Sequence, residues 1–263
     1  LYVYYGNPGV GSQENVSGVW SNDFTGVWQL DETPDGTSDE IGDSTGNGYH
    51  GTTYGSMDSA DQISAQVNGG LDFDGSDDYI ALDMYYDGTS ALSQLTVCNW
   101  FNTTYSNATW NNNWAFIDFD RSEYFDFYIN ADDGTLGFST NDNGTIDDFN
   151  GSTSGLNDGT GHYGCAVYDG TDKHIYVDGD PDATASNPHS GDALGSSNAR
   201  YGYIGDGSEA GTFNDDGNDI FYQGAIDALH YSETVRDADW IKTSYNNQND
   251  PDSYLTVESE QSY

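Results

Sequence analysis

Apolar and polar residues alternate along much of the chain, with the period of two that is typical of strands buried on one face. The loops between these segments are rich in Gly, Asn and Asp. Asp-Gly pairs at 133–134 and 178–179 directly follow two of the segments and supply the positive φ that tight hairpins require. We expect strands at 26–30, 71–73, 79–82, 95–101, 124–129, 136–138, 163–168, 174–177 and 224–229. The pattern predicts an all-β sandwich of two antiparallel sheets.

One helix is predicted near the C-terminus, from Asp237 to Tyr245. Asp237 is a suitable N-cap, and Trp240, Ile241 and Tyr245 lie on one side of the helix. The Asn-rich run at 246–251 should then end it. No Pro/Ser-rich linker or internal repeat divides the chain.

Composition agrees with short strands and narrows the possible partners. The chain has 33 Gly, 21 Tyr and 14% aromatic residues. Its 45 acidic and 5 basic residues give a net charge of −40. Nucleic-acid binding is excluded, because five scattered cations cannot form a basic surface. No apolar run is long enough to span a membrane. The acidic clusters either bind divalent cations or stay solvated, and the favoured interpretation is a solvated surface suited to saline or calcium-rich surroundings.

The two cysteines, Cys98 and Cys165, each lie in a strand-like segment. A disulfide is the favoured interpretation for a secreted chain, and two buried thiols are the alternative. The chain begins at Leu1 without Met, which favours a processed protein or a piece of a longer one. We expect the first residues to pack as a strand, in their own sheet or in a neighbour's; they are Leu1, Tyr2, Val3, Tyr4 and Tyr5.

Six segments, in order, resemble the laminin-G-like, concanavalin A-like jelly roll. They are 26–32, 43–51, 71–80, 95–101, the pair 166–170 and 175–179, and 224–227 before the helix. The resemblance covers roughly 24–257. Residues 1–8 resemble the tail of an uncharacterised domain that precedes such jelly rolls in prokaryotic surface proteins. The expected domains are therefore an N-terminal strand segment (1–23), the jelly roll (24–257) and a C-terminal tail (258–263).

The resemblance also implies a structural calcium ion near the edge where the chain ends meet. Carried over from the family, its ligands would be Asp43, Asn47 and Asp227, with Glu32 and Asp74 as substitutes. Calcium takes six to eight oxygens, and a Gly-rich turn can add carbonyl groups. Alternatively, Asp43 and Asn47 only build an Asx turn.

Catalysis is not expected from the sequence. Related glucanases place a Glu-x-Asp-x-x-Glu set on one strand, and none of the eight Glu residues of this chain belongs to such a set. The five His are isolated, and no Gly-x-Ser-x-Gly or His-Glu-x-x-His motif is present.

Two non-catalytic roles at the cell surface are left. The favoured one is a self-assembling subunit of a filament, sheath or layer, in which residues 1–5 complete the sheet of a neighbouring copy. The alternative is a glycan-binding adhesin, in which Trp110 and Trp114 stack on sugar rings unless they fold inward. Five sequons permit N-glycans without arguing for them, at Asn15, Asn102, Asn107, Asn143 and Asn150.

Overall fold

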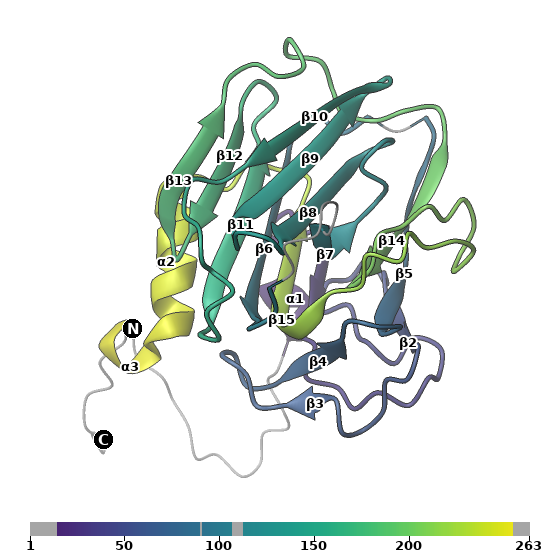
Figure 1. The fold of residues 1–263 in the computed structure, drawn as a ribbon, viewed down its shortest axis with the longest axis vertical. Coiled ribbons are helices and arrows are strands. Elements are labelled where there is room, and N and C mark those ends of the chain that lie inside the picture. The colour runs from purple at the N-terminus through teal and green to yellow at the C-terminus, as the bar shows by residue number, and fades with distance from the viewer. Residues whose placement is uncertain (1–14, 90, 107–112, 255–263) are drawn as a thin grey trace.

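The computed structural model describes residues 15–89, 91–106 and 113–254, which form two packed antiparallel sheets (Figure 1). The eight-stranded sheet contains β1 (Gly26–Trp28), β3 (Gln62–Ile63), β4 (Gly70–Asp74), β6 (Leu95–Asn102), β11 (His162–Tyr168), β12 (Lys173–Val177), β13 (Asp180–Ala185) and β15 (Gln223–Ser232). The seven-stranded sheet contains β2 (Gly51–Tyr54), β5 (Tyr79–Asp87), β7 (Asn113–Asp118), β8 (Phe125–Asn130), β9 (Leu136–Asp142), β10 (Thr145–Asn150) and β14 (Ala199–Ile204). The prediction of an all-β antiparallel sandwich is confirmed.

Strands distant in sequence are neighbours in both sheets. The eight-stranded sheet runs β13-β12-β11-β6-β15-β4-β3, with β1 also paired to β15. The seven-stranded sheet runs β10-β9-β8-β7-β14-β5-β2. In the eight-stranded sheet β15 lies between β6 and β4, and in the seven-stranded sheet β14 lies between β7 and β5. The C-terminal third of the chain therefore supplies an inner strand to each sheet.

The main core lies between the sheets and is rich in aromatic side chains. Phe116 illustrates its packing, because its ring contacts those of Phe101, Phe127 and Tyr222 at centroid distances of 4.8–5.3 Å. All four side chains are buried. Since Phe101 comes from the eight-stranded sheet and Phe116 and Phe127 from the seven-stranded one, this cluster joins the layers.

The predicted tight turn at 178–179 joins β12 directly to β13. Val177 pairs with Asp180, so the loop has two residues. Asp178 and Gly179 have φ of 52° and 78°, the left-handed values that a two-residue hairpin of this type needs. The Asp-Gly pair at 133–134 lies in the β8–β9 connection.

Helix α2 (Ala238–Asn249) covers the outer face of the eight-stranded sheet (Figure 1). Asp237 is its N-cap and accepts a hydrogen bond from the backbone N–H of Trp240, as predicted. The helix continues past Tyr245, however, and the short α3 (Pro251–Tyr254) follows. Packing explains the extension: Trp100 of β6 donates its indole N–H to the Gln248 side chain at 2.6 Å.

Cys98 and Cys165 form a disulfide between β6 and β11. The two residues are direct register partners, with Cα atoms 4.1 Å apart. The bond lies under α2, in a second apolar cluster that includes Trp100, Tyr163 and Ile241.

The predicted boundary at 23/24 falls in a segment that packs on the sandwich. Helix α1 (Val16–Val19) leads into Trp20, whose ring contacts His230 of β15 at 4.9 Å. Arg236 donates to the Asn22 carbonyl and stacks on Phe24. None of the helices in the described part of the chain has the length and apolar character needed to cross a membrane.

Candidate functional site

A groove of about 760 Å³ is lined by residues of β3, β4, the end of β6 and the start of β15. It leads into a smaller pocket of about 260 Å³, and Ile63, Asn102 and Ala225 line both. Gly224 helps to shape it: at φ 130°, a Cβ there would lie 2.3 Å from the carbonyl oxygen of Asn102. Glycine therefore allows β15 to pass close to the end of β6.

The groove combines aromatic and oxygen-rich side chains. Tyr105 is 37% exposed, and the carboxylates of Asp72 and Asp74 and the amide of Gln223 line the same groove. None of the described lining residues is Lys, Arg or His. Burial raises the pKa of Asp72, and the nearby charges of Asp61 and Asp74 raise it further. This surface therefore offers hydrogen-bond acceptors and a ring face.

Asp227 lies in the smaller pocket and is buried. Its Oδ2 accepts a hydrogen bond from the backbone N–H of Val67 at 2.7 Å, whereas its Oδ1 has no hydrogen-bond partner. Burial raises its pKa to about 7, although the N–H groups of Val67 and Gln66 oppose the shift. Asp227 thus anchors the 66–67 backbone to β15.

Of the predicted calcium ligands in the 43–47 turn, Asp43 has both carboxylate oxygens occupied by hydrogen bonds, whereas the hydrogen bonds of Asn47 involve only its amide nitrogen. The Asp43 carboxylate accepts hydrogen bonds from the N–H groups of Val27, Thr45, Gly48 and Tyr49 and from the Thr45 hydroxyl. Asn47 uses its amide nitrogen to bind the carbonyls of residues 24 and 25. Both residues build the turn, which was the alternative interpretation. Asp227 binds the backbone of a different segment through its Oδ2, so the occupied Asp43 carboxylate is the member of the predicted set that does not fit a calcium ion.

The two substitute calcium ligands, Glu32 and Asp74, also accept hydrogen bonds from backbone N–H groups. Glu32 accepts from the N–H of Gly42 at 2.8 Å. Asp74 belongs to the one group of three acidic, His or Cys ligands that the described residues bring together, with Asp77 and Asp78. Asp74 accepts from the N–H groups at 76 and 77, and buried Asp78 accepts from the Asp74 N–H and from Ser56. This cluster is a hydrogen-bonded loop.

Trp114 does not offer an exposed ring to a sugar, which corrects the prediction for this residue. It is 5% exposed and packs against Tyr105 at a centroid distance of 4.4 Å. Trp114 is a residue of β7 and belongs to the apolar core between the sheets, which explains its burial. The buried ring of Trp114 therefore packs against Tyr105, which lines the groove. Trp110 lies outside the described residues.

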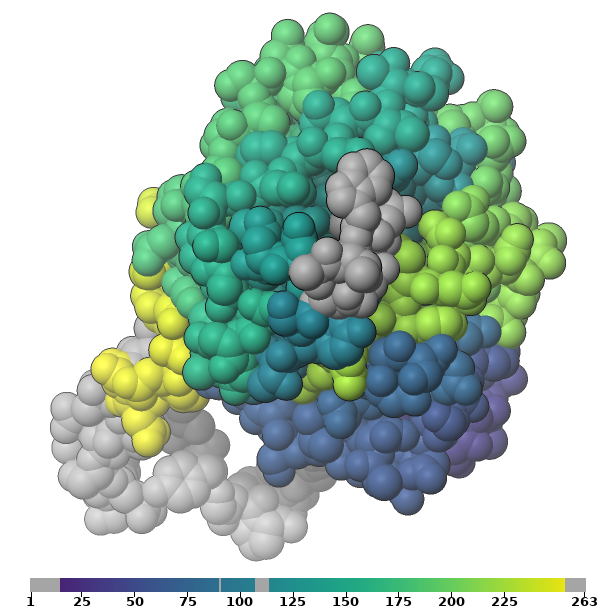
Figure 2. Space-filling view, viewed as in Figure 1, coloured from purple at the N-terminus to yellow at the C-terminus, as the bar shows by residue number. Residues whose placement is uncertain are grey.

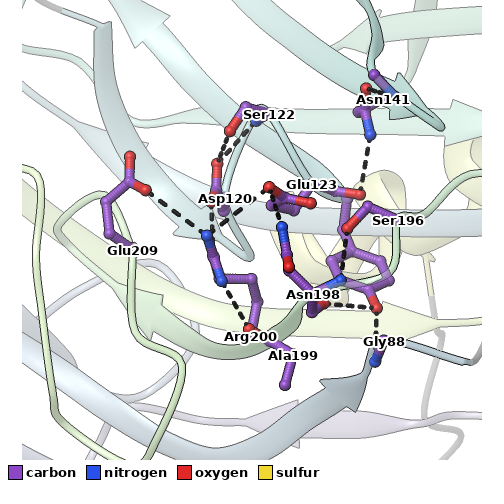
Figure 3. Close-up of polar contacts among 12 residues, drawn as sticks. Gly88, Asp120, Ser122, Glu123, Asn141, Ser196, Asn198, Ala199, Arg200 and Glu209 are labelled. Atoms are coloured by element: carbon purple, nitrogen blue, oxygen red, sulfur yellow. Dashed lines mark hydrogen bonds and ion pairs between the residues drawn. The ribbon is translucent and has the colours of Figure 1, made fainter.

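A second polar centre lies on the seven-stranded sheet, around Arg200 (Figure 3). Arg200 forms an ion pair with buried Asp120 at 2.6 Å and lies 3.8 and 3.9 Å from Glu123 and Glu209. Asn198 donates to Glu123 at 2.8 Å. Burial raises the pKa of Glu209, and the charge of Asp120 adds to the shift. Arg200 thus joins the β7–β8 turn to the 205–222 loop.

Tyrosines cover the neighbouring part of this sheet. Tyr85 is 50% exposed and stacks on Tyr201 at 4.8 Å, and Tyr79 contacts Tyr54 and Tyr203 at 5.3 and 5.1 Å. In Figure 2 the surface near residues 200–222 (yellow-green) borders that of β2 and β5 (blue). The Tyr79 hydroxyl fixes the 205–222 loop by donating to Asn214.

The sequons differ in accessibility. Asn15, Asn143 and Asn150 are exposed. Asn102 is partly buried in the groove, where its amide nitrogen donates to the Gly159 carbonyl at 3.1 Å. Asn107 and the predicted assembly strand at 1–5 lie outside the described residues.

A sequence profile described as the concanavalin A-like lectin/glucanases superfamily matches residues 74–242, more than half of the chain. The chain belongs to this superfamily. The resemblance drawn from the six segments is confirmed. No curated protein is similar enough in sequence to count as a relative.

Several solved structures share the superfamily fold at low sequence identity. Domain 4 of AbnA, an extracellular arabinanase from Geobacillus stearothermophilus solved with arabinotriose, has a TM-score of 0.57 and 15% identity, over 84% of this chain and 97% of that domain. The binding domain of Paraclostridial Mosquitocidal Protein 1 has a TM-score of 0.58 and 11% identity, over 83% of this chain and 52% of that one. The receptor binding domain of botulinum neurotoxin C/D mosaic serotype has a TM-score of 0.59 and 12% identity, over 86% and 52%. The chain thus spans about half the length of the toxin domains.

The groove residues other than Asp74 and Asp227 were missed at the sequence level. Asp72 lies within a predicted strand, and its position on the rim depends on the pairing of β4 with β15. Tyr105 and Gln223 come from segments without strand periodicity. Only the Leu-Asp-Phe-Asp alternation at 71–74 carried a signal, since it places both acids on one face of a strand.

Proposed function

We propose that the chain is a carbohydrate-binding module of an extracellular protein, and that sugars bind in the groove between β4 and β15. The observation that carries this proposal is the meeting of Tyr105 with Asp72, Asp74 and Gln223 in one concave surface. The apolar face of a sugar ring packs on an aromatic ring, and its hydroxyls donate to carboxylate and amide oxygens.

Two further findings support this role. One neighbour in the same fold is an arabinanase domain solved with arabinotriose, and two others are the binding domain of a mosquitocidal protein and the receptor binding domain of a botulinum neurotoxin. The Cys98–Cys165 disulfide favours an oxidising compartment, and so supports an extracellular location. We expect binding without hydrolysis, because these neighbours are binding domains.

The test is binding of arabinan and of other oligosaccharides on a glycan array, followed by titration calorimetry with the best ligand. We expect Tyr105→Ala to weaken binding at least about tenfold, since it removes the stacking surface and about 1.4 kcal/mol corresponds to that change. Asp72→Asn should weaken it less, because one acceptor oxygen is kept.

Val235→Ala is the matched control, because Val235 is 37% exposed and lies outside the groove. Its affinity should equal that of the wild type. A blank array in millimolar calcium, or equal affinities for Tyr105→Ala and the control, would contradict the proposed function.

Self-assembly is the second proposed role, and the open edge of the seven-stranded sheet supports it. Among the described residues, the six residues of the edge strand β10 pair only with β9, and Ile146 on this strand is exposed. An unpaired edge can accept a strand from another copy. Deleting residues 1–5 should then abolish polymers seen by electron microscopy and leave a folded monomer. Unchanged assembly of the shortened chain would rule out strand donation by this segment.

A further inference from the structure

Two buried aspartates face one another on the outer side of the seven-stranded sheet. Asp118 on β7 is the register partner of Asp126 on β8, and their side chains are 2% and 1% exposed. Phe125 and Phe127, on either side of Asp126, belong to the core between the sheets. Because successive side chains of a strand alternate between faces, the two acids point away from that core.

Each carboxylate keeps one oxygen without a hydrogen bond, although the backbone N–H groups of Asp120 and Ser208 bind Asp118 and lower its pKa in part. Oδ1 of Asp118 and Oδ1 of Asp126 are both buried without a hydrogen-bond partner. An ionised carboxylate buried in this way costs several kcal/mol, and a second one directly opposite adds repulsion. Two ionised groups are therefore the least favourable state of this pair.

The surroundings do not neutralise the pair. Of the nearby cations, Arg121 pairs with Asp148 at 3.0 Å and Arg200 pairs with Asp120 at 2.6 Å. The facing side chains of Tyr203 on β14, Ser139 on β9 and Tyr128 on β8 are neutral. The other charged groups that act on the pair, Asp120 and Asp148, are acidic.

The titration behaviour agrees with this geometry. Burial raises the pKa of Asp118 well above its ordinary value, and the charges of Asp126 and Asp120 raise it further. Burial likewise raises the pKa of Asp126 well above its ordinary value, although Arg121 opposes the shift.

We propose that Asp118 and Asp126 form a proton-binding carboxyl pair, which holds at least one proton at neutral pH and releases it to solvent in alkaline solution. Release leaves two facing negative charges between β7 and β8 and weakens the pairing of these strands. The backbone N–H of Ser208 binds Asp118, so the 205–222 loop is affected as well. The pair would make this face of the sheet sensitive to pH, independently of any ligand in the groove.

A proton suits this position better than a metal ion. Calcium takes six to eight oxygens, and magnesium requires six in octahedral geometry. Among the described Asp, Glu, His and Cys residues, the only three that bring ligand atoms within 4.8 Å of one another are Asp74, Asp77 and Asp78. Asp118 and Asp126 therefore lack a third such ligand among the described residues, whereas a proton on either carboxylate needs no further groups.

The test is urea unfolding of the wild type, Asp118→Asn and Asp126→Asn between pH 5 and 9 at high salt. A group that keeps its proton only in the folded state makes stability fall as pH rises, by up to about tenfold in the unfolding constant per pH unit and per proton. Asparagine resembles the protonated acid. The pH dependence of the free energy of unfolding should therefore be weaker in each variant than in the wild type, by an amount that corresponds to at most about one proton. At pH 8 each variant should be at least as stable as the wild type.

Asp132→Asn is the matched control, because Asp132 is exposed in the turn between β8 and β9 and is not among the groups whose charge acts on Asp118 or Asp126. Its slope should equal that of the wild type. Two results would overturn the proposal: slopes unchanged in both test variants, or a chelator that lowers the melting temperature of the wild type but not of these variants.

If the variants do not fold, infrared spectroscopy of the wild type at pH 8.5 decides the question. Asp206 and Asp227 have pKa values of about 7 and are largely ionised at that pH. A protonated carboxyl band that persists there supports the carboxyl pair, and its absence would overturn it.

Discussion

The side chain of Lys173 crosses from one sheet to the other. It starts on β12 and is fully buried, and its ammonium group donates to the carbonyl of Phe138 on β9 and to that of Asp147 on β10. It also forms an ion pair with the Asp147 carboxylate at 2.6 Å. Burial lowers the pKa of Lys173, and Asp147 opposes the shift.

We expect Lys173→Met to destabilise the protein by about 2 kcal/mol, because it removes one partner of a largely buried pair and leaves two carbonyls short of a donor. Asp147 is partly exposed and can turn to water, which keeps the loss moderate. Urea unfolding measures the change. Lys242→Met is the control, since its ion pair with Asp180 is exposed and should contribute little. Equal stability of the two variants would contradict this role for Lys173.

The burial of polar side chains such as that of Lys173 could not be predicted from the sequence. Lys173, Asp118 and Asp126 have polar side chains, and composition favours the surface for them. The alternation of apolar and polar residues at 124–129 predicts a strand, and β8 confirms it. Which strand pairs with it, and therefore that Asp126 faces Asp118 in a buried row, depends on contacts between distant segments.

At the scale of elements, the disulfide joins β6 and β11 in the middle of the eight-stranded sheet. It links residues separated by 67 positions, so in the unfolded chain it closes a long loop. We expect Cys98→Ala combined with Cys165→Ala to destabilise the protein by about 4 kcal/mol, mainly through loop-closure entropy. Chemical denaturation of the variant, compared with the oxidised wild type, gives the value.

Reduced wild type is the control for that variant, since it breaks the bond and keeps both sulfur atoms. Both samples should lose about the same stability. If reduction has no effect while the variant is unstable, the loss comes from apolar packing beneath α2 and not from the cross-link.

The predicted elements were those with a strong local signal. Asp178-Gly179 fixed a hairpin because only a few residues adopt two successive positive φ values easily. Asp237 fixed the start of α2 through one capping hydrogen bond. The end of α2 and the strands β7, β10 and β14 were not predicted, because their positions depend on packing, as the contact of Gln248 with Trp100 shows.

At the scale of the whole molecule, the net charge of −40 is spread over 12,500 Å² of accessible surface, roughly 300 Å² per net charge. Neighbouring charges are then about 17 Å apart, a distance at which screening is weak at 0.01 M salt and nearly complete at 0.15 M. The proton proposed for the Asp118–Asp126 pair would remove at least one of these charges and reduce the repulsion in the folded state.

We therefore expect the melting temperature to rise by several degrees between 0.01 and 0.2 M NaCl and to change little above that, because screening is then complete. Calorimetry in matched buffers measures the shift. Choline chloride should act like NaCl at equal ionic strength, since screening does not depend on the identity of the cation. A continued rise to 1 M salt would contradict a purely electrostatic cause.

The same titration separates general screening from a calcium site. Calcium stabilisation stays a prediction, now without Asp43 as a ligand, because backbone N–H groups occupy its carboxylate. If a site exists elsewhere, millimolar CaCl2 should raise the melting temperature more than MgCl2 at equal ionic strength, and a chelator should reverse the gain. Equal curves for the two salts would show that the acidic surface responds to charge alone, and the implied calcium would have to be abandoned.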